Sequence, residues 1–360
     1  MKPTIHHATI RGDAYAVGRG LGEAVRPHMT AVTGASEEFR ALDTRWRGSE
    51  LVRHLLEAAR AVFPDYIREL EGMADGAGVD FDTLFVWNCR GDLRYPPGTV
   101  SPRVEAAVAD GCTTVMLPAG HDPAAPDDAL IAHNEDGSEE LDGHCFWVRV
   151  ERDGGIPFSS FLYPGMLPGH TLAVNDTGLV QTINNIRAED LGPGIPRHFI
   201  SLAVLDCGDI ASALAILGRT DRASGFHHAL GNAAEGRVVS VEAPASGCRA
   251  NEVECPVAHA NHLVDPELAH VEQQVTRSYA FRQQAANEMT TTGETPEAIL
   301  FHEGETATTS IHRRPSPEED DYGFTLATAV FRLGPAGIDW RLHKDVENQD
   351  VYRGRVGLSA

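Results

Sequence analysis

The chain has few basic residues relative to acidic ones, and it lacks any long apolar run. Its 360 residues include 30 Lys and Arg against 52 Asp and Glu, which gives a formal net charge of −22. A surface with this charge repels phosphate backbones and anionic lipid, so we expect neither nucleic acid nor a membrane as a partner. No stretch approaches the roughly 20 apolar residues that a membrane-spanning helix needs.

The sequence predicts neither a signal peptide nor a disulfide framework. Residues 1–13 contain no apolar run of signal-peptide length, so we expect a cytoplasmic protein. Thiols stay reduced in that compartment, and free cysteines are usually buried. The even number would allow pairing, but we expect free thiols at Cys89, Cys112, Cys145, Cys207, Cys248 and Cys255.

Motifs that bind phosphates, dinucleotides or compact metal centres do not occur. The sequence has no Walker motif, no glycine-rich dinucleotide fingerprint and no Gly-x-Ser-x-Gly motif. Cys248, Cys255, His259 and His262 are four potential zinc ligands, but their spacing matches no compact zinc finger. We therefore expect neither a cofactor nor a metal ion.

The period of the apolar residues changes near residue 111. Before that point the spacing is helical, as in residues 64–75, where Pro64 suits a helix start and Gly76 and Gly78 offer a stop. Residues 95–98 break the pattern, and residues 99–110 are expected to form an exposed connector.

After residue 111 the sequence consists of short strand-like runs that alternate with turn residues. Asp209 is expected to cap a helix that ends at Gly218, and longer helical stretches are expected at residues 266–287 and 297–302. Strands that arrive as hairpins favour antiparallel sheets covered by helices over βαβ units. The expected strands are residues 113–117, 130–133, 145–151, 158–163, 171–175, 179–184, 226–230, 237–242, 257–261, 325–333 and 337–342.

At the change of period stands the sequence Asp110-Gly111-Cys112-Thr113-Thr114. Only the thiolate of a cysteine is strongly nucleophilic, and a free thiol has a pKa of about 8.5. A chain-terminal α-amine, with a pKa of about 7.7–8.0, can take up the thiol proton near neutral pH. Self-cleavage between Gly111 and Cys112 would place both groups on one residue, and Gly111 adds no side-chain bulk there.

Further motifs downstream resemble those of a known enzyme family. In order they are Glu71-Gly72-Met73-Ala74-Asp75-Gly76, His133-Asn134-Glu135-Asp136-Gly137, Ala260-Asn261-His262-Leu263 and Ser310-Ile311-His312-Arg313. With the pentapeptide around Cys112, they resemble the acyl-coenzyme A:6-aminopenicillanic acid acyltransferase family, the cysteine branch of the N-terminal-nucleophile hydrolases. The chain departs from the family pattern at His312, where a cysteine is usual, and at Ala260, where a threonine is usual.

The resemblance implies a role for each matched residue. Cys112 would be the nucleophile for self-cleavage and then for the substrate, and Asn261 would donate its amide to the oxyanion. Asp136 would orient groups around the nucleophile, and Arg313 would hold a substrate carboxylate or the Asp136 charge. Ser310 and Thr114 would contribute to substrate binding.

Each of these residues also has an ordinary structural interpretation. Residues 134–137 are typical of a turn, and Asn261 with His262 could cap the segment that follows. Arg313 beside Arg314 could be a solvated pair of charges, and Thr114 a simple strand former. The sequence alone does not decide between these interpretations and the catalytic ones.

The resemblance implies an α+β fold, a four-layer αββα sandwich. Residues 1–111 would be a helical chain released by self-cleavage, residues 112–360 the nucleophile-bearing chain, and both would stay together as one globular unit. The expected function is hydrolysis of a small N-acyl amide through a thioester on Cys112. Two alternatives remain: an acyltransferase that moves an acyl group from a thioester donor such as acyl-coenzyme A to an amine, and an uncleaved binding protein with the same fold.

Overall fold

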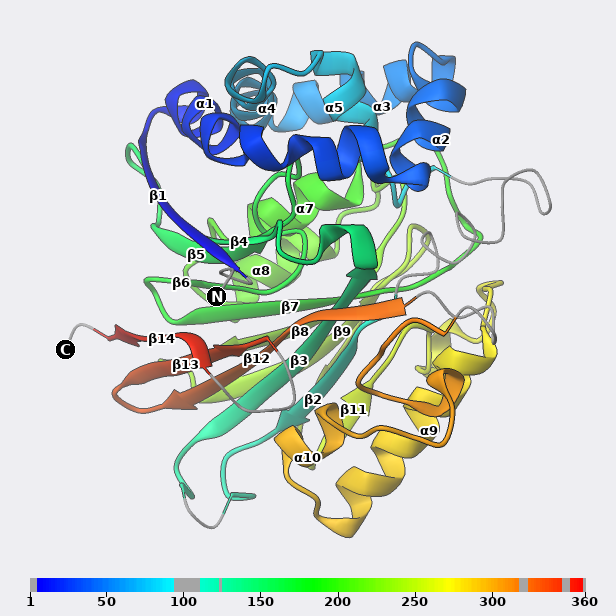
Figure 1. Cartoon of the computed structure of the whole chain (residues 1–360). Coiled ribbons are helices and arrows are strands. Elements are labelled where there is room, and N and C mark those ends of the chain that lie inside the picture. Colours follow the sequence, from blue (N-terminus) through cyan, green and yellow to red (C-terminus); the bar gives the residue numbers. More distant parts are fainter. Residues whose placement is uncertain (1–4, 94–110, 123–124, 317–322, 345–349, 359–360) are drawn as a thin grey trace.

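The protein consists of two β-sheets that face each other and carry helices on their outer sides (Figure 1). The computed structural model describes residues 5–93, 111–122, 125–316, 323–344 and 350–358. Within these ranges, no helix is both long enough and apolar enough to cross a membrane. The four-layer α+β fold class expected from the sequence is confirmed.

The N-terminal segment forms the upper layer in Figure 1. Its helix α4 (Pro64–Ala77) matches the helix predicted at residues 64–75 and ends at Gly78, which adopts the left-handed conformation with φ 72°. The other elements of this segment are β1 (His6–Gly12), α1 (Ala14–Val25), the short turns η1 (Arg26–His28) and η2 (Ala31–Ala35), α2 (Glu37–Trp46), α3 (Glu50–Val62) and α5 (Phe81–Asn88).

Helices α1 and α4 approach each other closely because both carry glycines at their contact. A Cβ atom added to Gly18 would lie 1.7 Å from the carbonyl oxygen of Glu69, and one added to Gly72 would lie 2.2 Å from that of Tyr15. Any side chain at these positions would therefore push the two helices apart. The same contact explains Gly76, which the sequence suggested as a helix stop but which lies inside α4 against Arg19.

The first sheet has eight strands in the order β1-β4-β5-β6-β7-β8-β9-β10. Strand β1 pairs with β4 in parallel, and all the other pairs are antiparallel. A tight turn at residues 175–178 joins β6 to β7, with Gly178 at φ 87°. The strands after β1 are β4 (Phe146–Arg152), β5 (Phe158–Leu162), β6 (Ala173–Asn175), β7 (Leu179–Asn185), β8 (Phe226–Asn232), β9 (Arg237–Ala243) and β10 (Arg249–Glu252).

The second sheet has six strands in the order β11-β2-β3-β12-β13-β14, and every pair in it is antiparallel. Helix α9 (Arg277–Thr292) contacts β11 and β2, and α10 (Pro296–Leu300) contacts β2 and β3, so both cover its outer face. The strands are β2 (Thr113–Leu117), β3 (Ala129–Ser138), β11 (Val257–His259), β12 (Gly323–Gly334), β13 (Gly337–His343) and β14 (Asp350–Gly357).

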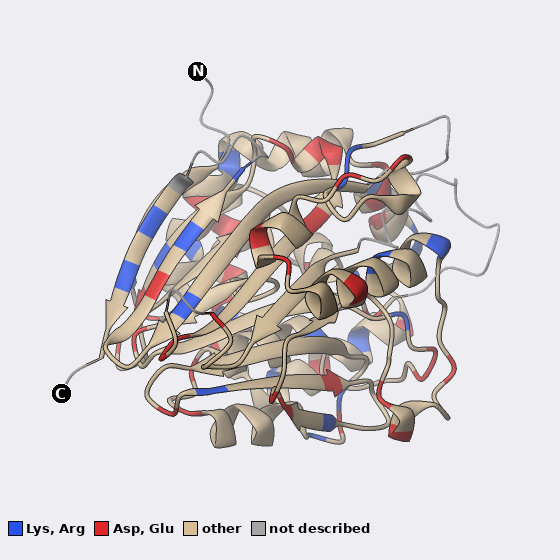
Figure 2. Cartoon of the chain, turned by 90° about the horizontal axis from the view of Figure 1, so that it is seen from below, with Lys and Arg blue, Asp and Glu red and all other residues tan. Residues whose placement is uncertain are grey.

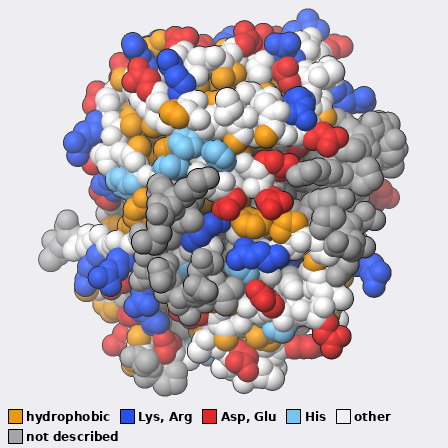
Figure 3. Space-filling view, in the orientation of Figure 1, with side chains coloured by type: hydrophobic (Ala, Val, Ile, Leu, Met, Phe, Trp, Pro, Cys, Tyr) orange, Lys and Arg blue, Asp and Glu red, His pale blue; other side chains and the backbone are white. Residues whose placement is uncertain are grey.

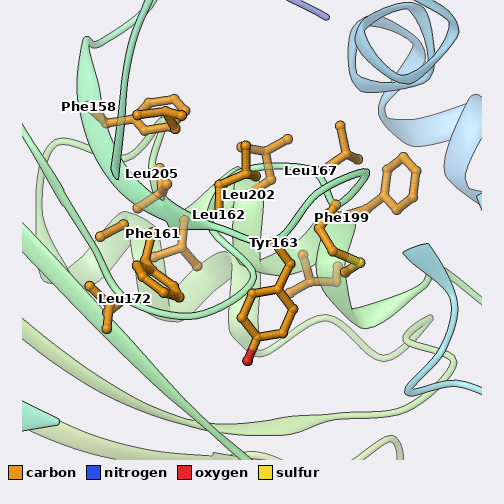
Figure 4. Close-up of a cluster of buried hydrophobic side chains, with 14 of the residues drawn as sticks. Phe158, Phe161, Leu162, Tyr163, Leu167, Leu172, Phe199, Leu202 and Leu205 are labelled. Atoms are coloured by element: carbon orange, nitrogen blue, oxygen red, sulfur yellow. The ribbon is translucent and has the colours of Figure 1, made fainter. Parts of the chain in front are cut away.

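The core fills both the space between the sheets and the space above the first sheet. Strand β2 contacts β7, and β3 contacts β9, so the inner faces of the sheets pack on each other. Above the first sheet, α7 (Arg197–Val204) and α8 (Ile210–Leu217) pack on each other. Figure 4 shows part of this core, where Phe161, Leu172 and Leu202 cluster and Tyr163 lies at the edge with its hydroxyl pointing away.

Some expectations about local structure were wrong. The stretch expected as one helix at residues 266–287 is a short turn, η4 (Pro266–Leu268), followed by irregular chain before α9 begins at Arg277. Strand β3 continues to Ser138, so residues 134–137 are part of a strand and not a turn. The breaker at residues 95–98 and the whole connector at residues 99–110 lie outside the described residues.

The N-terminal segment contacts the rest of the chain over a wide area. Strand β1 supplies an edge of the first sheet, and the buried carboxylate of Glu69 forms an ion pair with Arg152 of β4 at 2.7 Å. Histidines gather in one patch on the face shown in Figure 3. Between the N-terminal segment and the rest of the chain, the rings of His28 and His144 are in contact, and their Nδ1 atoms lie 3.1 Å apart. This segment therefore packs as part of the same globular body.

Acidic side chains are scattered over the face of the molecule shown in Figure 3. Basic side chains form bands on the outer strands of the second sheet (Figure 2), where β13 and β14 carry Arg341, Arg353 and Arg355. Arg341 lies directly opposite Arg353 in the β13–β14 register.

Candidate active site

Cys112 lies directly before β2 and is almost completely buried. Its backbone carbonyl accepts a hydrogen bond of 2.8 Å from the Arg282 guanidinium on α9. Burial raises the pKa of the Cys112 thiol well above its ordinary value, and the nearby carboxylates of Glu135 and Asp136 raise it further. The thiol of the uncut chain is therefore protonated at neutral pH and needs a base before it can react.

The carboxylate that accepts a hydrogen bond from this thiol is that of Glu135 in β3. The β2–β3 register pairs Thr113 with Asn134, which brings Cys112 opposite Glu135. The thiol donates to Glu135 Oε2 at 3.3 Å, and His133 Nε2 lies 3.2 Å from the same oxygen. The hydroxyls of Thr171 and Tyr163 also donate to this carboxylate, one to each oxygen.

These donors decide the charge of Glu135. Burial alone would raise the pKa of the Glu135 carboxyl, but the hydrogen bonds from His133 and Thr171 and the charge of His133 act in the opposite direction and outweigh it. The pKa of Glu135 therefore lies below its ordinary value, and the side chain is a buried carboxylate next to the thiol.

Gly111 lies in a space that only a glycine fits. A Cβ atom added there would be 2.2 Å from Arg282 Nη2 and 2.9 Å from Asn261 Oδ1. Arg282 Nη2 in turn donates to Asn261 Oδ1 at 2.7 Å. The Gly111–Cys112 peptide bond is thus flanked by the thiol on one side and by a buried amide and guanidinium on the other.

Asn261 is held in this position by a network of buried groups. Its Nδ2 donates to the carbonyl of Asn185 at 2.9 Å, and its Oδ1 accepts from Arg282. Glu242 holds the flanking residues, since it lies 2.8 Å from His259 Nε2 and accepts from the backbone N–H groups of residues 264 and 265. The amide is therefore oriented before any substrate binds.

Asp136 also lies next to Cys112, but its carboxylate points to the opposite face of β3 from Glu135. Its Oδ1 accepts from the Thr325 hydroxyl at 2.7 Å, while its backbone N–H interacts with the Cys112 sulfur. Burial raises the pKa of Asp136 to about 7, although the charges of Arg313 and Arg282 oppose this shift. Within the described ranges, Asp136 Oδ2 has no hydrogen-bond partner.

A small cavity of about 40 Å³ opens beside Cys112. Burial lowers the pKa of His170 to about 4, so its ring is neutral; Nδ1 can donate to the Leu167 carbonyl at 3.2 Å. Its Nε2 then faces the site as a buried acceptor that lacks a donor among the described residues. The N-terminal segment supplies part of the wall. The lining residues are Glu38, Arg90, Gly91, Cys112, Glu135, Asp136, Tyr163, His170, Ile183, Asn185, Arg197, His198 and Phe226.

The structure brings together most of the residues that the sequence singled out, although not all of them line the cavity. Arg313 lies close enough to Asp136 to affect its pKa, and its backbone N–H donates to the Thr325 hydroxyl at 2.8 Å. Thr114 is fully buried under the site and donates to Asn184. Ser310 donates to the Thr306 carbonyl within its own loop, at 2.8 Å, and does not line the cavity.

Three residues of the site were missed by the sequence reasoning: His133, Glu135 and Arg282. His133 and Glu135 are neighbours on one face of β3, so the signal was the two-residue period of a strand that was read as a possible turn. Arg282 comes from α9, and nothing local to residue 282 indicates that it reaches Cys112.

The site contains one group of side chains with metal-ligand chemistry. The ligand atoms of Cys112, His133 and Glu135 lie within 4.8 Å of one another. Hydrogen bonds to the single oxygen Glu135 Oε2 explain this closeness without an ion, so we assign no metal to it. The four potential zinc ligands Cys248, Cys255, His259 and His262, all of them described, form no such group.

Two facing sheets between helical layers, with a buried thiol directly before β2, form the four-layer αββα architecture that the family resemblance implied. The profile of the acyl-coenzyme A:6-aminopenicillanic acid acyl-transferase family matches residues 124–346, which is more than half of the chain. The chain therefore belongs to this family. The matched range begins after Cys112, so it does not include this residue.

Two relatives show the range of the family. The chain is 31% identical to the β-alanyl-dopamine/carcinine hydrolase of Drosophila melanogaster over 222 residues, 58% of this chain and 55% of that protein. It is 22% identical to the 40 kDa form of the acyl-coenzyme A:6-aminopenicillanic-acid-acyltransferase of Emericella nidulans over 264 residues, 72% of this chain and 69% of that one. The match thus spans little more than half of the length of the first relative.

Two solved structures are similar at a low level. One is a mutant conjugated bile acid hydrolase from Clostridium perfringens, with a TM-score of 0.39, 10% identity, and coverage of 69% of this chain and 98% of that one. The other is penicillin V acylase from Agrobacterium tumefaciens, with a TM-score of 0.35, 13% identity, and coverage of 69% and 92%.

Proposed function

We propose that the protein is a self-processing amidohydrolase that cleaves a small N-acyl amide through a thioester on Cys112. The observation that carries this proposal is the surroundings of the Gly111–Cys112 bond. A thiol, an oriented amide at Asn261 and the Arg282 guanidinium meet there, and a side chain on Gly111 would displace the amide or the guanidinium.

Self-cleavage uses the thiol and the preceding peptide bond. The Cys112 sulfur attacks the carbonyl carbon of Gly111, the C–N bond breaks, and the Gly111 acyl group is left on sulfur as a thioester. Water then hydrolyses the thioester, which gives a carboxylate at Gly111 and a free amine and thiol at Cys112. For the oxyanion that forms on the way, the proposed donor is Asn261 Nδ2, which has a second N–H besides the one that donates to the Asn185 carbonyl; the atom of this amide that lies next to Gly111 is Oδ1.

The free α-amine of Cys112 then serves as the base in turnover, because its ordinary pKa of about 7.7–8.0 is close to working pH. Asp136 is suited to hold this amine, since its Oδ2 is a buried acceptor with no donor among the described residues of the uncut chain. The charge of Arg313 helps to keep Asp136 ionised once the ammonium group is present.

The released N-terminal chain stays in the enzyme in this proposal. It forms one wall of the cavity through Glu38, Arg90 and Gly91, and it supplies β1 to the first sheet. The Glu69–Arg152 ion pair crosses the boundary in a buried setting, where loss of either partner is costly. Residues 1–111 and 112–360 are therefore proposed to act as one unit after the cut.

The proposed substrates are small N-acyl amides, because one relative is a hydrolase of β-alanyl-dopamine and carcinine. The buried acceptor His170 Nε2 lines the cavity and would accept from an N–H group of such a substrate. Hydrolysis is favoured over transfer because water is always available as acceptor. Acyl transfer from a thioester donor is the second candidate, since the Emericella nidulans relative is an acyl-coenzyme A-dependent acyltransferase by name.

The proposal is tested with the purified protein and a panel of N-acyl amides that includes β-alanyl amines. We expect the free acid as product. We also expect an acyl thioester on Cys112, which hydroxylamine converts to a hydroxamate. Cys112→Ala should give neither product. Added free amine or acyl thioester that diverts the product from the free acid would favour the transferase. An uncut wild-type chain with no activity towards the panel would favour a binding protein instead.

A further inference from the structure

We propose that Glu135 takes the proton of the Cys112 thiol when the uncut chain cleaves itself, and that His133 holds the Glu135 carboxylate for this step. The inference rests on the proposed self-cleavage and adds a catalytic residue to it. Glu135 is thus the base for self-cleavage, which takes place before the α-amine of Cys112 exists.

A base other than the α-amine is required by the chemistry of the uncut chain. The nitrogen of Cys112 is then part of the Gly111–Cys112 amide, which accepts no proton near neutral pH. The thiol itself is protonated, as its burial requires. Some neighbouring group must therefore accept the thiol proton as the carbon–sulfur bond forms.

The geometry of Glu135 fits this task. Its Oε2 is the acceptor of the thiol hydrogen bond at 3.3 Å, close to the reach expected of a general base. Tyr163 is anchored in the apolar cluster of Figure 4 and donates to Oε1, and Thr171 donates to Oε2, so the carboxylate is fixed from both sides. Glu135 thus points at the sulfur without needing to move.

The directions of the hydrogen bonds below the site make His133 a cation. Asn184 Nδ2 donates to the His259 carbonyl, so its Oδ1 accepts the Thr114 hydroxyl at 2.5 Å. The Thr114 oxygen must then accept from His133 Nδ1 at 2.8 Å. With Glu135 ionised, His133 Nε2 donates as well, so the ring carries a proton on both nitrogens.

This positive ring compensates the charge at each stage. Before the reaction it pairs with the Glu135 carboxylate, and when the thiol proton moves to Glu135, it lies beside the negative charge that develops on sulfur and the Gly111 oxygen. The transfer is uphill, because a carboxylate is a weaker base than a thiolate. A step that occurs once in each chain tolerates such a barrier, whereas repeated turnover uses the α-amine.

The proton balance closes within the site. The thiol proton goes to Glu135 Oε2, the sulfur bonds to the Gly111 carbon, and the C–N bond breaks. The departing Cys112 nitrogen then receives the proton from Glu135 and becomes the free α-amine. Glu135 ends as it began, as a carboxylate, and water completes the cut by hydrolysing the thioester.

Asp136 is the competing candidate, and its geometry is poorer. Its carboxylate bonds to Thr325 on the other face of β3, and only its backbone N–H reaches the sulfur. The two carboxylates also differ in charge state, because the pKa of Asp136 is about 7 and that of Glu135 lies below its ordinary value. The pH dependence of self-cleavage therefore separates them.

The test follows freshly synthesised full chains by intact mass over time, for wild type, Glu135→Gln and the control Glu69→Gln. The control removes another fully buried carboxylate from an ion pair, that of Glu69 with Arg152, on the far side of the first sheet. We expect the wild type and Glu69→Gln to cut at similar rates, and Glu135→Gln to cut at least about 10²-fold more slowly.

Thermal unfolding of each variant shows whether it has folded. A folded Glu135→Gln chain that cuts at the wild-type rate would overturn the inference. If Glu135→Gln fails to fold, Glu135→Asp keeps the charge on a shorter arm, and we expect at least tenfold slower cutting; cutting at the wild-type rate would refute the role of Glu135 equally well.

The pH profile gives a second readout that a purely structural role would not affect. We expect the wild-type rate of self-cleavage not to fall as the pH is lowered from about 7 to about 5, because Glu135 remains ionised over that range. His133, Cys112, Tyr163 and His170 are the other titratable groups that face Glu135. A rate that falls below pH 7 would assign the base to Asp136. A wild-type chain that never cuts would instead refute the proposed function itself.

Discussion

Gly111→Ala is the substitution for which the structure makes the sharpest prediction. The added Cβ would lie 2.2 Å from Arg282 Nη2 and 2.9 Å from Asn261 Oδ1, both well inside van der Waals contact. Arg282 is fully buried and donates to the Cys112 carbonyl, the Thr113 hydroxyl and Asn261 Oδ1, so it cannot move aside freely. The methyl group must displace either the guanidinium or the scissile bond.

The size of the effect follows from this overlap. Relief of the contact needs a shift of about 1 Å, and a misplacement of that size at a reacting bond typically costs about 10²-fold in rate. Overpacking of a rigid buried site also lowers stability by about 1–3 kcal/mol. We therefore expect Gly111→Ala to slow self-cleavage about 10²-fold and to lower the melting temperature of the uncut chain.

The assay is a time course of intact mass on freshly synthesised chains, with melting temperatures measured in a Cys112→Ala background that prevents cutting. Gly192→Ala is the matched control, because a Cβ atom at Gly192 meets nothing within 4 Å. If Gly111→Ala cuts at the wild-type rate and melts like the control, then Arg282 and Asn261 do not enclose the scissile bond in the way described.

Three further predictions concern the same site and its support. Asn261→Ala removes the proposed oxyanion donor. We expect the self-cleaved fraction of this variant to turn over substrate about 10²–10³-fold more slowly than the wild type in hydrolysis assays. The pKa of Asp136, about 7 in the folded uncut chain and near 3.8 when unfolded, makes it a source of stability that is lost as pH rises through 7. The uncut Cys112→Ala chain should therefore melt at a lower temperature at about pH 8 than at about pH 5, and Asp136→Asn should reduce that difference. Arg152→Met leaves the buried Glu69 carboxylate unpaired at a cost of about 3–5 kcal/mol, so the two fragments of the cut protein should separate more easily on size-exclusion chromatography.

Local sequence pattern was sufficient to predict two of the elements, β2 and α4. Strand β2 has the same bounds, Thr113–Leu117, in the structure as in the prediction, because its β-branched and apolar residues are bounded by a glycine and a proline. Helix α4 likewise follows its apolar period and its Pro and Gly termini. Both elements are determined by residues within their own length.

The missed parts of the site depend on contacts between distant segments. Glu135 reaches the thiol only through the β2–β3 register, and residues 134–137 look like a turn until β12 pairs with them. Arg282 depends on where α9 begins, and the prediction merged α9 with an irregular stretch that starts at Pro266. Such pairings come from tertiary structure, which overrides local propensity.

Strand β1 shows the same limit at the N-terminus. Its seven residues, His6–Gly12, alternate between exposed and half-buried positions and contain too few apolar side chains to indicate a buried strand. Their parallel pairing with β4 supplies the stability that the local sequence lacks. The N-terminal segment was therefore expected to be purely helical, although it also completes the first sheet.

The central claim is that Cys112 becomes an N-terminus by cutting the chain before it. The most direct measurement is sequencing, by tandem mass spectrometry, of the N-terminal peptide of the larger fragment from purified wild-type protein. The account predicts a peptide that begins with Cys112 and carries a free α-amine, and an intact chain in Cys112→Ala. A wild-type chain that stays intact after long incubation, or a fragment that begins at any other residue, would contradict it.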